Sequence, residues 1–151
     1  MQKQSLVLLM ADDDEEDCLL VGLAFKDAKI AGEMRFVEDG KELLDYLLRE
    51  GEYADPGKAP LPDLILLDLN MPRMDGREVL KEIKSIPQLK DIPVAILTTS
   101  REKRDVDYCY GAGAFDFITK SVLFEDIVKM LQSLVERLRT DHTIRATDSQ
   151  S

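Results

Sequence analysis

The sequence lacks the marks of several common protein classes. Its two cysteines, Cys18 and Cys109, lie far apart and form no C-x-x-C spacing of a zinc or redox site. We therefore expect a reduced, cytoplasmic protein whose cysteines act as small apolar residues within helices. The apolar run Leu6–Ala11 is too short for a signal sequence or a membrane span, so no membrane association is expected.

Positive charge is also scarce. Thirty Asp and Glu residues against twenty Lys and Arg residues give a formal net charge of −10 over 151 residues. An acidic surface repels a phosphate backbone, so direct DNA binding is not expected. The hydrophobic content of 44% suits one compact domain with its own core. We expect this domain to span residues 1–139 and a flexible polar tail to occupy residues 140–151.

Short apolar runs alternate with longer segments of helical period. Strands are predicted at Ser5–Ala11, Met34–Val37, Leu64–Leu67, Pro93–Leu97 and Ala114–Ile118. Helices are predicted at about 15–28, 40–48, 79–86, 103–110 and 123–139, and the Gly- and Pro-rich segment 51–62 is predicted to be a loop. This alternation predicts an α/β fold with a five-stranded parallel sheet. Right-handed crossovers favour the flavodoxin-like strand order 2-1-3-4-5.

Polar residues follow the predicted strands where each one ends. They are Asp12 and Asp13 after the first strand, Asp68 and Asn70 after the third, Thr98 after the fourth and Lys120 after the fifth. Ligands of such sheets bind beside the carboxyl ends of the strands, so we expect these groups to converge. Carboxylates about 4 Å apart repel by roughly 4 kcal/mol per pair at an effective dielectric near 20. A hard divalent cation, Mg²⁺ or Mn²⁺, is therefore expected among them.

A cation and Lys120 beside Asp68 would make a site for a phosphoryl group. Asp68 would attack phosphorus to give an acyl phosphate, while Lys120 and the Thr98 hydroxyl stabilise the transferred oxygens. The turn-forming pairs Met71-Pro72 and Asp75-Gly76 would lead the chain away and leave space above Asp68. The acidic residues from Asp14 to Asp17 are expected to cap the following helix.

These features together resemble the receiver domain of two-component response regulators, a (βα)5 fold, over nearly the whole chain. The matching segments are the pair Asp12-Asp13 and the stretches "DLNMPRMDG", "ILTTS" and "FITKS". The resemblance implies that Asp68 is the phosphoacceptor and that Thr98 and Lys120 contact the phosphoryl oxygens. It also implies Mg²⁺ binding by Asp12 (largely through a water), Asp13, Asp68 and the backbone carbonyl of Asn70.

Two positions refine this resemblance. Phe117 matches the aromatic switch residue of the family, although its sequence context alone favours a core residue. The family usually has proline after the lysine, with a cis peptide between them, but Ser121 follows Lys120 here. A cis bond before serine costs about 2.5–4 kcal/mol, so both a cis and a trans loop are left open. The "TKS" variant, the long 51–62 loop and "GREVL" resemble the small regulators associated with bacterial phytochromes.

The resemblance implies a single-domain response regulator that takes a phosphoryl group from a sensor histidine kinase, here of phytochrome type. Phosphorylation would change the face of the fourth helix, fifth strand and fifth helix for partner binding, homodimerisation or phosphorelay. Catalysis would be limited to self-phosphorylation and self-dephosphorylation.

Three other functions match part of the sequence pattern. A phosphohydrolase with an aspartyl-phosphate would need a second acid where the chain has Asn70. A flavodoxin-like nucleotide or flavin binder would meet repulsion from the acidic run after the first strand. The third alternative is a docking module of receiver fold that is never phosphorylated, which the intact acidic site disfavours.

Overall fold

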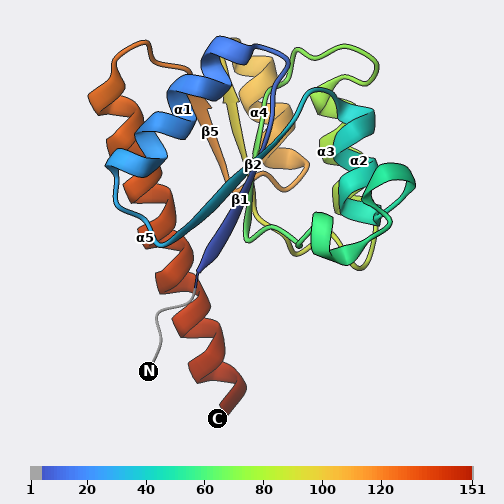
Figure 1. The fold of residues 1–151 in the computed structure, drawn as a ribbon, viewed down its shortest axis with the longest axis vertical. Coiled ribbons are helices and arrows are strands. Elements are labelled where there is room, and N and C mark those ends of the chain that lie inside the picture. Colours follow the sequence, from blue (N-terminus) through green and yellow to red (C-terminus); the bar gives the residue numbers. More distant parts are fainter. Residues whose placement is uncertain (1–4, 151) are drawn as a thin grey trace. The chain divides into compact units, whose positions relative to one another are not determined.

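The strands and helices alternate along the chain as the sequence predicts. A computed structural model describes residues 5–150, with side chains for residues 5–140 (Figure 1). In order, the elements are β1 Leu6–Ala11, α1 Glu15–Asp27, β2 Gly32–Val37, α2 Gly40–Leu48, β3 Leu64–Leu67, α3 Gly76–Ser85, β4 Val94–Thr98, α4 Lys103–Gly111, β5 Asp116–Thr119 and α5 Phe124–Gln150. All neighbouring strands are parallel and their order is β2-β1-β3-β4-β5, which confirms the predicted fold class.

The chain forms two compact units. The larger contains the sheet, α2, α3, α4 and the first turn of α1, with boundaries at Cys18, Ala31 and Lys120. The smaller contains residues Leu19–Ile30, which include the rest of α1, and the chain from Ser121 on, including α5.

One apolar core organises the larger unit. Alternate side chains of the central strands, such as Leu9, Ile65 and Ile96, pack with apolar side chains of α2, α3 and α4. Helices α2 and α3 lie side by side in this unit (Figure 1). The other side chains of the central strands, including Leu8 and Leu66, are also fully buried. Strands buried on both faces explain why their sequences are continuous apolar runs without alternation.

The smaller unit has its own contacts. Gln132 Nε2 in α5 donates a hydrogen bond to the carbonyl oxygen of Ala28, 3.4 Å away, just after α1. Its buried apolar side chains recur with helical spacing, as expected for an apolar helix face; they are Val21, Ala24, Phe25, Ile127, Leu131 and Leu134. In the described part of the chain, no helix combines the length and apolar character needed to cross a membrane.

Several element boundaries differ from the predicted ones. Strand β2 begins at Gly32, because this glycine pairs with Leu6 so closely that any Cβ would clash with the Leu6 backbone. Strand β5 begins at Asp116, because the Ala114 amide donates to the Cys109 carbonyl and closes the end of α4. The segment 51–62 is a loop that contains two short 3-10 helices.

The predicted end of the last helix, near Arg139, is wrong, since α5 continues to Gln150. The segment from Phe124 to Gln150 contains neither glycine nor proline, so nothing in its sequence interrupts the helix. The flexibility expected of residues 140–151 stays a prediction, and the side chains from residue 141 on lie outside the described residues.

Candidate functional site

The candidate site lies where three strands of the larger unit end. The backbone amides of Asp12, Asp68 and Lys120 each donate to the neighbouring strand. Their acceptors are the carbonyls of Val37 (3.1 Å), Ala11 (3.0 Å) and Thr98 (2.8 Å), respectively. Each site residue therefore forms the last hydrogen bond between two strands, and its side chain emerges at the carboxyl edge of the sheet, as predicted for ligand sites in such folds.

Three carboxylates gather at this edge. One carboxylate oxygen from each of Asp12, Asp13 and Asp68 lies within 4.8 Å of the others. Asp12 is 2% exposed and Asp68 7% exposed, whereas Asp13 is exposed. Charges at such separations repel by several kcal/mol when water is partly excluded, roughly 4 kcal/mol at 4 Å and an effective dielectric of 20. The cluster therefore favours a cation.

The donor chemistry of these carboxylates fits a hard divalent ion. Asp12 Oδ1 accepts a hydrogen bond from the Asp14 amide at 2.9 Å. Asp12 Oδ2 is buried and pairs with Lys120 by charge, without a well-aligned hydrogen bond among the described residues. A metal ion would stabilise this buried oxygen by giving it a ligand bond. The three carboxylates together form an all-oxygen donor set, which is the kind that Mg²⁺ and Mn²⁺ bind. Asp12, Asp13 and Asp68 are the residues that could hold such an ion.

Lys120 supplies positive charge to this cluster. Its Nζ lies 2.7 Å from Asp12 Oδ2, 2.7 Å from Asp17 Oδ2 and 3.2 Å from Asp68 Oδ2. Burial alone would lower the pKa of Lys120, but the contacts with Asp12 and Asp17 and the charge of Asp68 outweigh it and raise that pKa. Burial raises the pKa of Asp12, and Lys120 offsets only part of this effect. The lysine is thus a firmly charged group that faces the carboxylates.

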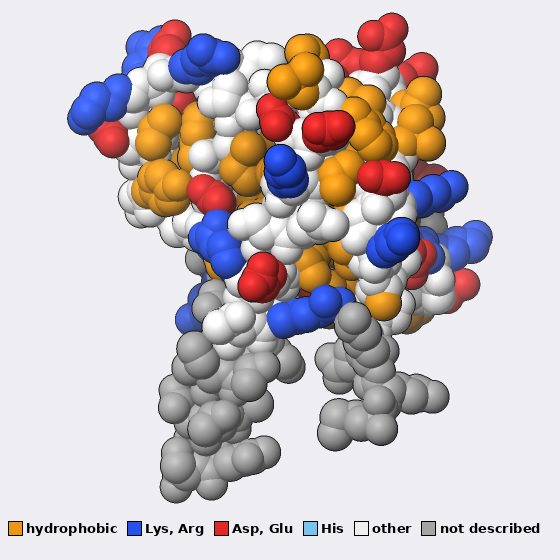
Figure 2. Space-filling model, turned by 90° about the vertical axis from the view of Figure 1, so that its left-hand side faces the viewer, with side chains coloured by type: hydrophobic (Ala, Val, Ile, Leu, Met, Phe, Trp, Pro, Cys, Tyr) orange, Lys and Arg blue, Asp and Glu red, His pale blue; other side chains and the backbone are white. Residues whose placement is uncertain are grey.

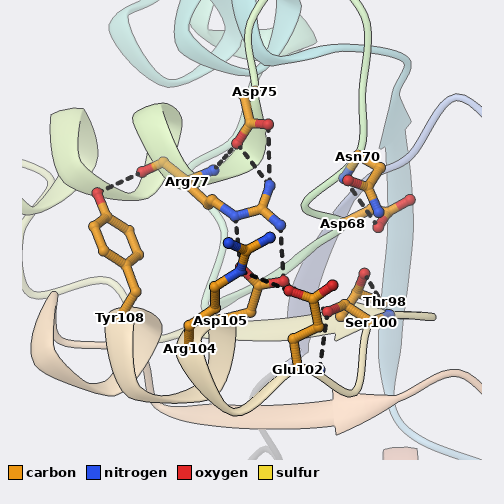
Figure 3. A network of polar contacts seen from close by, with 10 residues as sticks. All are labelled: Asp68, Asn70, Asp75, Arg77, Thr98, Ser100, Glu102, Arg104, Asp105 and Tyr108. Carbon is orange, nitrogen blue, oxygen red and sulfur yellow. Dashed lines mark hydrogen bonds and ion pairs between the residues drawn. The ribbon is translucent and has the colours of Figure 1, made fainter.

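The remaining predicted residues occupy different places around the cluster. Thr98 is fully buried, and its Oγ1 accepts the Ser100 amide at 3.3 Å. The Asn70 backbone amide donates to Asp68 Oδ1 at 3.4 Å (Figure 3). Phe117 is half-buried and packs against the apolar core.

The loop after β3 makes a tight turn beside Asp68. The Gly76 amide donates to the Leu69 carbonyl at 2.9 Å and returns the chain towards the strand end. A Cβ on Gly76 would clash with the Asp68 carbonyl oxygen and lie 2.7 Å from Leu69 Cα. Glycine is required here because the first turn of α3 touches the backbone that carries Asp68.

The peptide bond after Lys120 is trans, since the described residues contain no cis peptide. Of the cis and trans forms that the sequence left open for Lys120-Ser121, the structure has the trans form.

Asp17 was not predicted as a site residue. Asp14 caps α1, because its Oδ1 accepts the amides of Glu16 (2.9 Å) and Asp17 (3.2 Å). Asp17 instead directs its carboxylate to Lys120. The only hint in the sequence is that the acidic run is longer than capping requires, since one N-cap residue and a first-turn acid are enough.

Comparisons with known proteins give a consistent result. A family model described as the response regulator receiver domain matches residues 8–132. The response regulator Rcp1 of Synechocystis sp. is 42% identical over 128 residues, 85% of this chain and 85% of Rcp1. The crystal structure of its Mn²⁺-bound form has a TM-score of 0.76 at 42% identity, covering 85% of this chain and 91% of that chain.

Two further solved structures are similar. The phosphorylated cyanobacterial phytochrome response regulator RcpA has a TM-score of 0.80 at 40% identity, covering 88% of this chain and 93% of its own. Response regulator RPA3017, described as acting in red light signaling of R. palustris, has a TM-score of 0.79 at 35% identity, covering 85% and 90%.

These similarities decide between the classes that the sequence left open. The family model matches most of the chain and Rcp1 is 42% identical, so the protein is a receiver-domain response regulator and not a classical enzyme. The chain belongs to the response regulator receiver domain family.

Proposed function

We propose that this domain accepts a phosphoryl group on Asp68 from a sensor histidine kinase, with Mg²⁺ bound by Asp12, Asp13, Asp68 and the Asn70 backbone carbonyl. The observation that supports it is the close approach of three carboxylates beside the charged Lys120. The names of similar regulators, which include phytochrome response regulators, favour a kinase of phytochrome type.

The chemistry follows from the positions of the side chains. An Asp68 carboxylate oxygen attacks phosphorus, the bond from phosphorus to the donor nitrogen breaks, and the imidazole leaves with that electron pair and takes up a proton. When Asp68 becomes an acyl phosphate, its carboxylate no longer carries the negative charge that faces Lys120. Lys120 then binds a phosphoryl oxygen instead. The Thr98 hydroxyl donates to another phosphoryl oxygen. A divalent ion held by Asp12, Asp13 and Asp68 would further neutralise the phosphoryl charge.

The signal then leaves through a protein surface. We propose that Thr98 and Phe117 respond to the phosphoryl group and change what α4, β5 and α5 present to a partner, to a second copy or to a phosphorelay protein. We expect no direct DNA contact. On the face seen in Figure 2, lysine and arginine side chains are interspersed with acidic ones and form no continuous basic surface among the described side chains.

Intact mass spectrometry after incubation with acetyl phosphate and Mg²⁺ tests this function. We expect one added phosphoryl group in the wild type, its loss in Asp68→Asn and its loss with a chelator. Asp14→Asn is the matched control, because Asp14 caps α1 and should leave the label intact. If the wild type gains no phosphoryl group and does not bind beryllofluoride, the domain is a docking module instead.

A further inference from the structure

A bidentate ion pair joins α3 to α4 close to the candidate site. Arg77 Nε lies 2.8 Å from Asp105 Oδ1, and Arg77 Nη2 lies 2.8 Å from Asp105 Oδ2 (Figure 3). Arg77 also contacts both carboxylate oxygens of Asp75, at 3.2 and 3.0 Å. The Asp105 side chain is only 8% exposed. A two-pronged pair to a buried carboxylate fixes orientation as well as distance.

One end of this pair connects with the loop that carries Thr98. The Ser100 hydroxyl donates to Asp105 Oδ2 at 2.6 Å, and the Ser100 amide donates to Thr98 Oγ1 at 3.3 Å. The Glu102 amide in turn donates to Ser100 Oγ at 3.3 Å. Asp105 therefore sets the position of Ser100. Ser100 in turn orients the Thr98 hydroxyl, because an oxygen that accepts one amide directs its own proton elsewhere.

The other end connects with the backbone of Asp68. Arg77 follows Gly76, whose amide donates a hydrogen bond to the Leu69 carbonyl and where an added Cβ would clash with the Asp68 carbonyl oxygen. The chain of contacts thus starts at the residue proposed as phosphoacceptor and ends at the hydroxyl proposed to bind the phosphoryl group. It passes through Arg77 and Asp105, which are 28 residues apart in sequence.

We infer that Arg77 is a positioning residue for phosphoryl transfer. Through Asp105 and Ser100 it holds the Thr98 hydroxyl in a fixed place relative to Asp68, so that less reorganisation is needed when the phosphoryl group arrives. The inference rests on the proposed function, because it assigns a role only to a hydroxyl that meets phosphoryl oxygens. Arg77 itself pairs with Asp75 and Asp105, which lie outside the acidic cluster.

The test compares Arg77→Gln with Lys103→Gln. Both changes remove one cation, but Lys103 pairs, among the described residues, only with the exposed Asp107, also within α4, at 3.0 Å. The full chain is mixed with acetyl phosphate and Mg²⁺, and the phosphorylation rate constant is followed by intact mass. In this reaction Asp68 bonds to phosphorus as the phosphorus–oxygen bond breaks and acetate leaves. We expect Arg77→Gln to slow it about 2- to 30-fold, the range typical of residues that act through others, and Lys103→Gln to leave it unchanged.

Introducing Arg77→Gln into a Thr98→Val protein separates an effect through the Thr98 hydroxyl from a general loss of stability. Thr98→Val removes the hydroxyl while keeping the branched shape at a fully buried position. If Arg77 acts through Thr98, Arg77→Gln should slow the wild type but not the Thr98→Val protein. Asp105→Asn gives an independent variant, since it breaks the charge pair without leaving a buried carboxylate unpaired. It should reproduce the slower rate.

Each result has a defined meaning. An unchanged or faster rate in Arg77→Gln, or equal slowing with and without the Thr98 hydroxyl, would overturn the positioning role while leaving the proposed function intact. A wild type that takes no phosphoryl group would overturn the proposed function and this inference with it.

Discussion

Lys120 Nζ lies 2.7 Å from Asp17 Oδ2, although the two residues are 103 positions apart in the chain. This contact joins the end of β5 to the first turn of α1 and gives the lysine a third carboxylate beside Asp12 and Asp68. A phosphoryl group on Asp68 must therefore compete with Asp17 for the same ammonium group.

Removing the Asp17 charge should accelerate phosphorylation. In Asp17→Asn, Lys120 has one fewer carboxylate partner and the site repels an anionic donor less, so we expect a rate with acetyl phosphate about two- to fivefold higher, the scale of a partly exposed ion pair. Glu16→Gln is the control, because this exposed neighbour removes the same charge away from Lys120. Equal rates in the two variants would show that Asp17 does not compete.

Divalent ions should stabilise the folded domain through the acidic cluster. At one hundred times its dissociation constant, a bound ion adds about 2.7 kcal/mol to the free energy of unfolding. For a chain of this length, such a gain raises Tm by about 5 to 10 °C. Thermal unfolding with Mg²⁺ or Mn²⁺ measures the rise, which Asp13→Asn should abolish and Asp14→Asn should keep. A full rise in Asp13→Asn would place the ion elsewhere.

Acid should weaken the link between α3 and α4. Hydrogen bonds from Arg77 and Ser100 lower the pKa of Asp105 from 3.8 to about 2. Because the folded-state pKa is the lower one, this stabilisation is complete above about pH 4 and is lost as pH falls towards 2. Between pH 6 and pH 3 it should decrease by about 1 kcal/mol. Urea unfolding of the wild type should show this extra loss, and Asp105→Asn should not. If the free energies of unfolding of the two proteins fall in parallel with pH, Asp105 does not contribute the expected stabilisation.

Gly76→Ala should damage both stability and phosphorylation. The added methyl group would clash with backbone atoms of Asp68 and Leu69. Backbone atoms cannot move aside as the end of a flexible side chain can. We expect a loss of about 2–4 kcal/mol in urea unfolding, at the upper end for overpacking. Gly111→Ala is the control, since its new Cβ would have no neighbour within 4 Å and alanine favours the helix. Similar free energies of unfolding for the two variants would refute the close approach.

The sequence predicts the parts of this molecule that depend on local pattern. Leu64–Leu67 is a buried strand followed at once by Asp68, and strand order alone brings this residue beside Asp12. The pairs that the sequence missed, Lys120 with Asp17 and Arg77 with Asp105, depend on where a helix turn points after tertiary packing. No spacing rule relates residues 103 or 28 positions apart. The boundary error at Gly32 has a related cause, because a glycine suggests a turn until its partner strand is known. The error beyond Arg139 has a different one, because polar residues without glycine or proline do not end a helix.

The last inter-strand hydrogen bonds of the sheet belong to the amides of Asp12, Asp68 and Lys120 themselves. Local unfolding at these residues would therefore also break the hydrogen bonds at the carboxyl end of the sheet. Their amide protons should therefore exchange with deuterium as slowly as those of neighbouring strand residues, and far more slowly than amides of the loop at residues 51–62. A site held in this way keeps its shape for as long as the sheet stays folded, so its reactivity can change only through the side chains and the loops around it.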